Sequence, residues 1–203
     1  MKTAKQLLKA KQAVKEEMDR QFPQSLSDDL WKKAEIRLDS ILKKYSLLSG
    51  GVRTHTDHYI FPSAAIYLTL CEEANQENAY AVIENTAIKH SNEAGRKLAK
   101  LMRLPGMKSF FVWFWNPMVK MLFGSSSGFQ NTFYPKKKGE YRMDVVACPY
   151  CRYFTELGCP ELTKIFCAND DRCYGNLPGL VFQRTGTLGT GADRCDFCLR
   201  KRA

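Results

Sequence analysis

Apolar positions in the first half of the chain recur at the spacing of helices. They predict four helices, over about residues 7–22, 27–48, 62–71 and 76–104. Pro23 ends the first of these, because proline cannot continue a helical hydrogen-bond ladder. Between the second and third helices, residues 52–61 are expected to form a loop that carries His55 and His58.

Residues 109–123 form the most aromatic part of the chain. We expect a helix that is buried or lines a groove, with a bend near Pro117. A helix lying on a membrane surface is the alternative, but the strongly cationic opposite face typical of such helices is missing. No stretch of roughly 18 residues lacks charge, so no membrane span is expected.

After residue 124 the pattern changes to short alternating runs that are typical of strands. Strands are predicted over residues 129–134, 140–147, 180–188 and 195–201, and short helices over 150–157 and 160–167. Pro135, three lysines and Gly139 separate the first two strands and predict a hairpin. The predicted fold class is α+β, a helical N-terminal half packed on a small antiparallel sheet with short helices. A helical region 1–124 and a cysteine-rich α+β region 125–203 are expected to form one integrated domain.

The chain has 203 residues and a formal net charge of +10. Its basic residues are dispersed, and the only short runs are 136–138 and 200–202. A nucleic-acid-binding protein usually gathers them into a stripe, so no nucleic-acid partner is expected. The polar, lysine-rich start has no apolar core of a secretory signal, which favours a cytoplasmic location.

Seven of the eight cysteines fall between residues 148 and 198, which in a reducing compartment favours metal, redox or nucleophilic roles over disulfides. Cys148 and Cys151 form one Cys-x-x-Cys pair, and Cys195 and Cys198 form another. Two such pairs can hold zinc. However, the second pair lies in a predicted strand, where residues three apart point to opposite faces. A redox dithiol is a second interpretation, but the surrounding βαβ pattern is absent.

Nucleophilic chemistry at single cysteines is the third interpretation. Cys167 is predicted to end a short helix and precedes Asp170, and Cys195 is followed directly by Asp196. A thiol beside a carboxylate supplies a nucleophile and an acid–base partner. The C-terminal end of a helix raises the pKa of a thiol, so Cys167 would need a nearby cation, or water would attack with Asp170 as base.

The same part of the chain resembles the L-2-amino-thiazoline-4-carboxylic acid hydrolase family. The resemblance is carried by the runs Cys148–Tyr150, Leu157–Leu162, Phe166–Asp170, Phe182–Leu188 and Gly191–Phe197, in the family's order and spacing. Cys148, Cys167, Cys195, Asp170 and Asp196 match residues that recur in the family. The remaining cysteines of the region do not, which makes the two Cys-x-x-Cys pairs incidental.

The resemblance implies a hydrolase that opens a cyclic amidine ring bearing a carboxylate, at a C–N bond, to give a carbamoyl-cysteine. The candidate catalytic residues are Cys167, Asp170, Cys195 and Asp196, with Cys167 preferred as the nucleophile. The candidate substrate-binding residues are Cys148, Arg184, Thr185 and His58, with Arg184 as a bidentate clamp for the substrate carboxylate. We expect a small-molecule substrate and no metal or cofactor, and oligomeric state is left open. The alternative is a zinc- or small-ligand-binding regulatory module without turnover.

Overall fold

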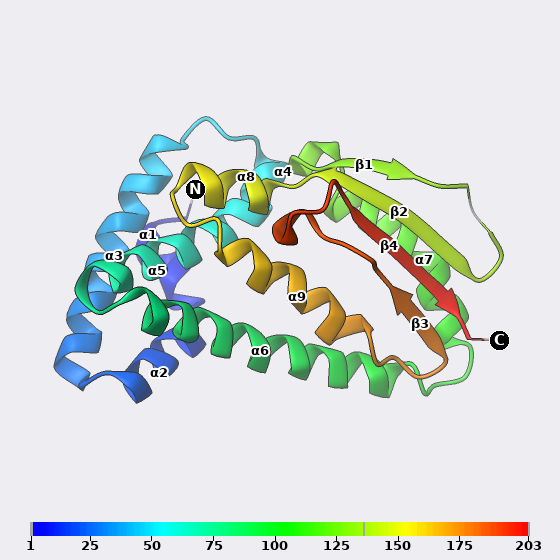
Figure 1. The fold of residues 1–203 in the computed structure, drawn as a ribbon, viewed down its shortest axis with the longest axis horizontal. Coiled ribbons are helices and arrows are strands. Elements are labelled where there is room, and N and C mark those ends of the chain that lie inside the picture. The colour runs from blue at the N-terminus through cyan, green and yellow to red at the C-terminus, as the bar shows by residue number, and fades with distance from the viewer. Residues whose placement is uncertain (1, 136, 203) are drawn as a thin grey trace.

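In the computed structural model, which describes residues 2–135 and 137–202, the chain folds as an α+β protein (Figure 1). This confirms the predicted fold class. Lys136, which belongs to the predicted hairpin connection and to the basic run 136–138, lies outside the described residues. No helix in the described ranges has the length and apolar character needed to cross a membrane.

The first half of the chain is helical from end to end. Its elements are α1 (Ala4–Lys9), α2 (Gln12–Gln21), α3 (Gln24–Lys44), α4 (Gly50–His55), a π-helix η1 (Thr56–Ile60), α5 (Phe61–Glu73), α6 (Gln76–Leu101) and α7 (Met107–Leu122). The helix predicted over 7–22 is thus two helices, which break at Ala10 and Lys11.

The loop predicted over residues 52–61 is wrong, because α4 and η1 continue into α5 without a break. The polar side chains that favoured a loop are satisfied within the helix. Arg53 pairs with Asp57 one turn on, at 2.9 Å, and the Thr56 hydroxyl donates to the carbonyl of Val52. The π-helical turn places His58 and Tyr59 in the lining of a cavity, and such turns are frequent at functional sites.

The second half contributes a four-stranded antiparallel sheet in the order β1-β2-β4-β3. Its strands are β1 (Gln130–Phe133), β2 (Glu140–Ala147), β3 (Leu180–Gln183) and β4 (Cys195–Lys201). The strand predicted over 180–188 ends early at Gln183. There the chain leaves the sheet, because the Asp196 carboxylate accepts hydrogen bonds from the backbone N–H groups of Thr185 and Gly186.

Two helices, α8 (Pro149–Glu156) and α9 (Leu162–Tyr174), lie between β2 and β3 in the chain. Helix α9 extends well beyond the predicted end at Cys167. The acidic residues after Cys167 looked like a turn in the sequence, but Arg184 pairs with both Asp170 and Asp171 from outside the helix. Cys167 therefore lies in the middle of a helix, so its pKa is not raised by the C-terminal end of that helix.

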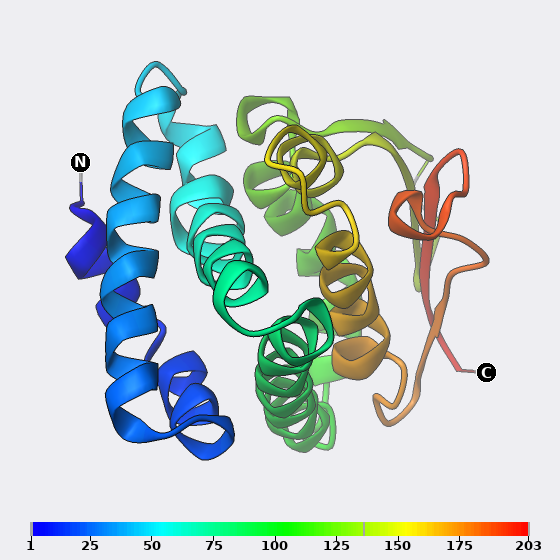
Figure 2. The same ribbon diagram turned by 60° about the vertical axis from the view of Figure 1, so that its left-hand side comes forward.

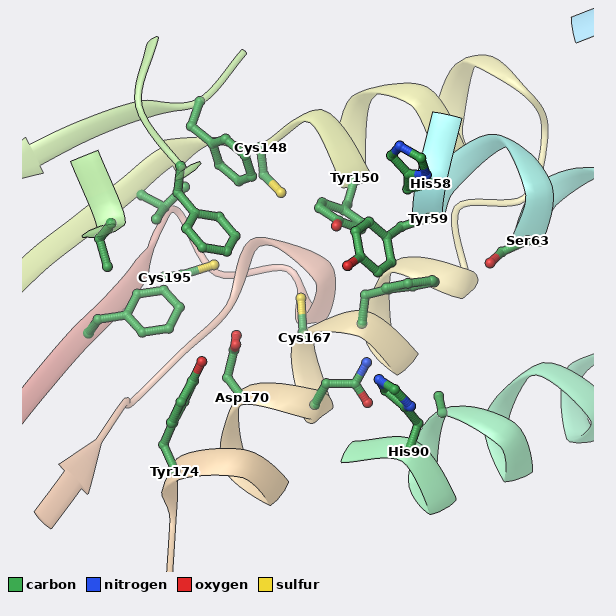
Figure 3. Close-up of a pocket in the computed structure, with 18 of the residues that line it drawn as sticks. His58, Tyr59, Ser63, His90, Cys148, Tyr150, Cys167, Asp170, Tyr174 and Cys195 are labelled. Carbon is green, nitrogen blue, oxygen red and sulfur yellow. The ribbon is translucent and has the colours of Figure 1, made fainter. Parts of the chain in front are cut away.

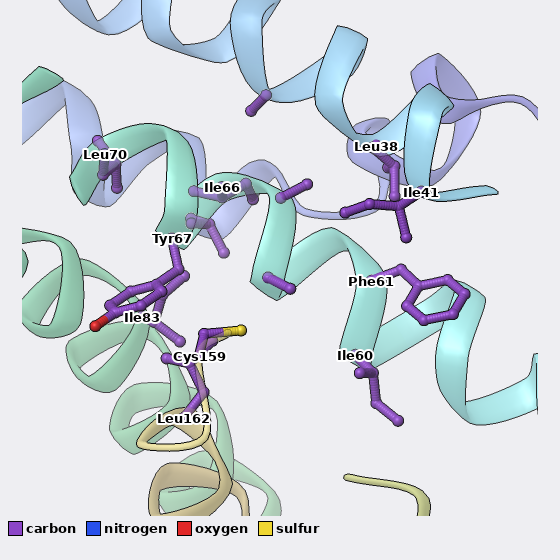
Figure 4. Packing of buried hydrophobic residues seen from close by; sticks show 14 of the residues in the cluster. Leu38, Ile41, Ile60, Phe61, Ile66, Tyr67, Leu70, Ile83, Cys159 and Leu162 are labelled. Carbon is purple, nitrogen blue, oxygen red and sulfur yellow. The ribbon is translucent and has the colours of Figure 1, made fainter. Parts of the chain in front are cut away.

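Helices cover one side of the sheet, as Figure 2 shows. One buried cluster packs the N-terminal helices against α8 and α9, and Figure 4 shows Phe61, Tyr67 and Leu162 within it. A second cluster packs α7 against the inner face of the sheet, with Val112, Trp115 and Val119 of α7 buried. Each cluster draws on residues from both sides of position 124.

Helix α7 has one face buried against the core and one face exposed to solvent, and it lines a pocket as the aromatic run predicts. Trp115 and Val119 face the sheet and a central pocket. The opposite side of the helix carries Phe110 and Trp113, which are 51% and 61% exposed. Pro117 is accommodated inside the helix.

Candidate active site

A cavity of about 580 Å³ lies between the helices and the inner face of the sheet. It is lined by side chains from α2, η1, α6, α7, β2, α8, α9 and β4, most of them apolar. Cys148, Cys167, Asp170 and Cys195 all line it, as Figure 3 shows. Arg184 and His58 line it as well, so the cavity brings together six of the eight residues that the sequence singled out. A pocket of this size and lining is typical of small-molecule sites.

Cys167 sits on the face of α9 that looks into the cavity. Hydrogen bonding from the Cys195 thiol acts most strongly on it and lowers its pKa, against the effect of burial. The Thr187 hydroxyl, the Gly189 N–H group and the charge of Arg184 act in the same direction, and together they bring the pKa of Cys167 to about 6. The surroundings of Cys167 therefore favour its thiolate, which is the form that attacks electrophiles.

Cys195 plays the complementary part in this thiol pair. It is 6% exposed at the start of β4, and the neighbouring Cys167 sulfur and burial both raise its pKa. The backbone N–H of Leu188 donates to its sulfur at 3.2 Å. Cys195 thus stays protonated and can donate its S–H to Cys167. Within the pair, the surroundings thus favour the negative charge on the Cys167 sulfur, with Cys195 as its hydrogen-bond donor.

The segment after β3 supplies the backbone donor to Cys167. A 3₁₀-helix, η3 (Leu188–Thr190), places Gly189 so close to Cys167 that an added Cβ would lie 2.8 Å from the sulfur. Only glycine allows this approach. Thr187, which precedes η3, is also buried. Sequence reasoning did not identify either residue, although Thr187 lies inside a run that carries the family resemblance and Gly189 directly follows that run.

Asp170 lies one turn of α9 beyond Cys167 and therefore on the same face of the helix. Burial is the main cause that raises its pKa, to about 7, and the Cys167 charge adds to it. The Arg184 guanidinium opposes the shift and donates a 2.9 Å hydrogen bond to the carboxylate. Asp170 is therefore a carboxyl group that can give or take a proton near neutral pH.

Arg184 already has internal partners for its guanidinium. Its side chain is 4% exposed, it pairs with Asp170 and Asp171, and it also donates to the Cys167 carbonyl at 2.9 Å. The rings of Phe182 and Phe197 flank it. The guanidinium that was expected to bind the substrate carboxylate is thus already paired with two acids of the protein. Arg184 instead holds the carboxylate of Asp170 and the backbone of Cys167.

The wall nearest Cys148 is built from thiol and aromatic groups. Cys148, at the start of α8, hydrogen-bonds with Cys151, which is the largest cause that raises its pKa. Tyr150 lies beside it, and its hydroxyl is 3.1 Å from Nδ1 of His55. His55 is buried and its Nε2 is 2.7 Å from the Leu122 carbonyl oxygen, so this histidine ties α7 to the pocket wall.

His58 lines the same cavity from η1, as its candidate role in substrate binding requires. Thr185 and Asp196 do not. Both line a separate depression on the outer face of the sheet, together with Cys198. There the Asp196 carboxylate accepts from the Thr185 hydroxyl at 2.7 Å. This places Asp196 under the loop that carries Thr187 and Gly189, where it positions the loop and does not contact the cavity.

The two Cys-x-x-Cys pairs do not converge. Cys195 lines the inner cavity, whereas Cys198 lines the depression on the outer face, as residues three apart in a strand should. Over residues 2–135 and 137–202, no three histidine, cysteine or acidic side chains are grouped closely enough to hold a metal ion.

In this α+β fold, a thiol of lowered pKa and a carboxyl group of raised pKa therefore line one cavity. The chain belongs to the L-2-amino-thiazoline-4-carboxylic acid hydrolase family, whose sequence profile matches residues 53–199. This confirms the resemblance found in the sequence, and the family is named for a hydrolase. Comparisons with curated proteins and with solved structures found no match.

Proposed function

We propose that this protein hydrolyses the ring of L-2-amino-thiazoline-4-carboxylic acid, or of a closely related cyclic amidine, with Cys167 as the nucleophile. The observation that carries the proposal is the Cys167 sulfur, which faces a cavity and whose pKa is held near 6 by Cys195, Thr187 and Gly189. The family membership supplies the substrate class.

The first half of the reaction forms a bond between the Cys167 sulfur and the ring carbon that joins nitrogen and sulfur. Asp170 gives its proton to the ring nitrogen, and it shuttles a second proton there from the exocyclic nitrogen as the C–N bond breaks. The cysteine amine is thereby released, while its sulfur and the Cys167 sulfur remain on the same carbon. This is a covalent intermediate of the kind that nucleophilic catalysis requires.

The second half consumes water. Asp170, now ionised, takes one proton from the water that adds to this carbon. The other proton of the water passes to the exocyclic nitrogen, which becomes the carbamoyl NH₂ group, as the C=O bond forms and the bond to the Cys167 sulfur breaks. The thiolate and the protonated Asp170 are restored. The balance is one substrate plus one water to one S-carbamoyl-cysteine. Cleavage of the ring C–S bond would instead give N-carbamoyl-cysteine, which carries a free thiol.

The test is turnover of the thiazoline carboxylate by purified protein, with the products resolved by mass spectrometry and free thiol measured in parallel. Wild-type protein should form a carbamoyl product with or without a chelator. Cys167→Ser should lower turnover by about 10³-fold or more, because a hydroxyl is a far weaker nucleophile. Cys198→Ser, on the outer face of the sheet, is the matched control and should keep full turnover.

Two results would contradict the proposal in different ways. No turnover of any member of a small panel of cyclic amidines would reject the hydrolase function. Near-full turnover by Cys167→Ser, with loss in Asp170→Asn, would show that water is the nucleophile and that Cys167 is structural.

A further inference from the structure

One basic group of the cavity comes from a part of the chain outside the family match. Lys11 lies between α1 and α2 and lines the same cavity as Cys167. The family profile begins at residue 53, so Lys11 belongs to a segment whose role the family does not assign.

Lys11 is half-buried and has no charged partner among the residues that the structure describes. Burial alone lowers its pKa to about 8, and no carboxylate in the described parts of the chain acts on it. Its ammonium group lies 5.0 Å from the ring centroid of Tyr59, which points into the cavity (Figure 3). With this pKa, Lys11 is mostly cationic at neutral pH. A desolvated cation that lacks a counter-ion is unfavourable in the empty site, and an anion placed beside it removes that cost.

The other charged groups of the cavity do not supply that anion, because neither the Cys167 thiolate nor the Asp170 carboxylate acts on the pKa of Lys11. Among the described lining residues, Asp170 is the one acid, and its carboxylate is bound to Arg184. His58 and His90 are the remaining basic residues of the lining, from η1 and α6. The cavity therefore has two regions. Near the Cys167 thiolate, the charges of Asp170 and Arg184 neutralise each other. The other region is basic, and Lys11 contributes its ammonium group.

We propose that Lys11 is the anion-binding group of the cavity and holds the carboxylate of the substrate while the electrophilic carbon faces Cys167. This assignment rests on the proposed function for the identity of the substrate, but not for the existence of the anion site. It also gives the substrate carboxylate a partner, because the guanidinium of Arg184 is already used. The site would then select small organic acids over neutral rings of the same shape.

The test uses two alkylating reagents of similar size, anionic iodoacetate and neutral iodoacetamide. Both transfer their CH₂ carbon to the Cys167 thiolate and release iodide, and mass spectrometry of the Cys167 peptide gives each rate. Lys11→Met keeps the aliphatic stem and removes the charge. It should slow iodoacetate by roughly 3- to 10-fold, as expected for one charge pair across a partly hydrated pocket, and should leave iodoacetamide within about 2-fold.

Two control variants separate charge from packing. Lys11→Arg retains the charge and should behave as the wild type. Lys9→Met removes an exposed lysine at the end of α1 and should change neither rate. Equal slowing of both reagents in Lys11→Met, or no change in either, would overturn the proposal.

Steady-state kinetics then connect the site to turnover. In Lys11→Met the KM for the thiazoline carboxylate should rise by about 10-fold with little change in kcat, while turnover of 2-amino-thiazoline, which lacks the carboxylate, should be unaffected. A kcat loss with unchanged KM would overturn the assignment to substrate binding. If the wild type hydrolyses neither compound but the alkylation rates still discriminate, the proposed function fails and the anion site stands.

Discussion

A Cβ atom at Gly189 would lie 2.8 Å from the sulfur of Cys167, closer than such atoms pack. Gly189→Ala should therefore push η3 away from α9 and lengthen the hydrogen bond from the Gly189 N–H to the thiolate. We expect the pKa of Cys167 to rise and turnover at pH 7 to fall by roughly 10- to 100-fold, with a stability cost of about 1–3 kcal/mol.

The measurement for Gly189→Ala is the rate of Cys167 alkylation against pH. The midpoint should move upward from the wild-type value. Gly50→Ala is the matched control, because nothing lies within 4 Å of a Cβ added at Gly50. An unchanged midpoint in Gly189→Ala would show that this N–H group does not stabilise the thiolate.

The pH dependence of turnover should differ from that of alkylation. The pKa of Cys167 is lowered to about 6, so the thiolate is present above pH 6 and lost below it. The pKa of Asp170 is raised to about 7, so its acid form is present below pH 7 and lost above it. Alkylation needs only the thiolate and should rise once, near pH 6, and then level off. Turnover needs both forms and should peak between pH 6 and 7.

Asp170→Asn separates these two groups. The variant should lose turnover by about 10²-fold or more, since it can no longer pass a proton to the ring nitrogen, yet Cys167 should still be alkylated readily. Asp171→Asn, whose carboxylate also pairs with Arg184 but is largely exposed, is the control. Turnover in wild type that stays level well above pH 7 would argue against Asp170 as the acid.

Asp196 should affect activity through the loop that it holds. Its carboxylate accepts from the Thr185 N–H, the Thr185 hydroxyl and the Gly186 N–H, at 2.8, 2.7 and 2.9 Å. An amide has one acceptor oxygen, so Asp196→Asn should lower the free energy of unfolding by about 1–3 kcal/mol at pH 7 and reduce turnover. Asp193→Asn, at an exposed position nearby, should do neither.

The Asp196 contribution to stability should also depend on pH. Burial acts to raise its pKa, but the hydrogen bonds from Thr185 and Gly186 outweigh burial, so the pKa lies below its usual value. The stabilisation is then full above the unfolded-state pKa and is lost as the pH falls through the folded-state pKa. The difference in unfolding free energy between wild type and Asp196→Asn should therefore shrink in acid. A constant difference down to about pH 2 would contradict this role.

The local pattern of apolar and polar residues was sufficient to predict an element where one face of that element is regularly buried. The alternation of residues 140–147 and 195–201 predicts the bounds of β2 and β4, which the structure confirms. Pattern failed where ion pairs stabilise a helix through polar residues that pattern alone assigns to a loop or a turn. The sequence predicts a loop over residues 52–61, but Arg53 and Asp57 form an ion pair within a continuous helix. The sequence also predicts that α9 ends at Cys167, but Arg184 pairs with the acids that follow and the helix continues.

The residues of the candidate site also divide into those that the sequence identifies and those that it does not. The resemblance pointed to Cys167, Asp170 and Cys195, because their spacing is preserved in the chain, and the fold places all three around one cavity. Lys11 could not be found in this way. It has no motif around it, and its burial arises only from the break between α1 and α2 and the packing of that break near Tyr59.

The sheet order has a consequence for how the reactive thiol arises during protein synthesis. β4 lies between β2 and β3, although it is the last of the four strands in the chain. A ribosome makes α9 and β3 first, so the nascent chain carries Cys167 before either Cys195 or Asp196 exists. Until β4 docks, Cys167 has no thiol donor and its backbone donor is not anchored. The newly made chain therefore carries an ordinary cysteine, and the reactive thiolate arises only when the sheet is completed.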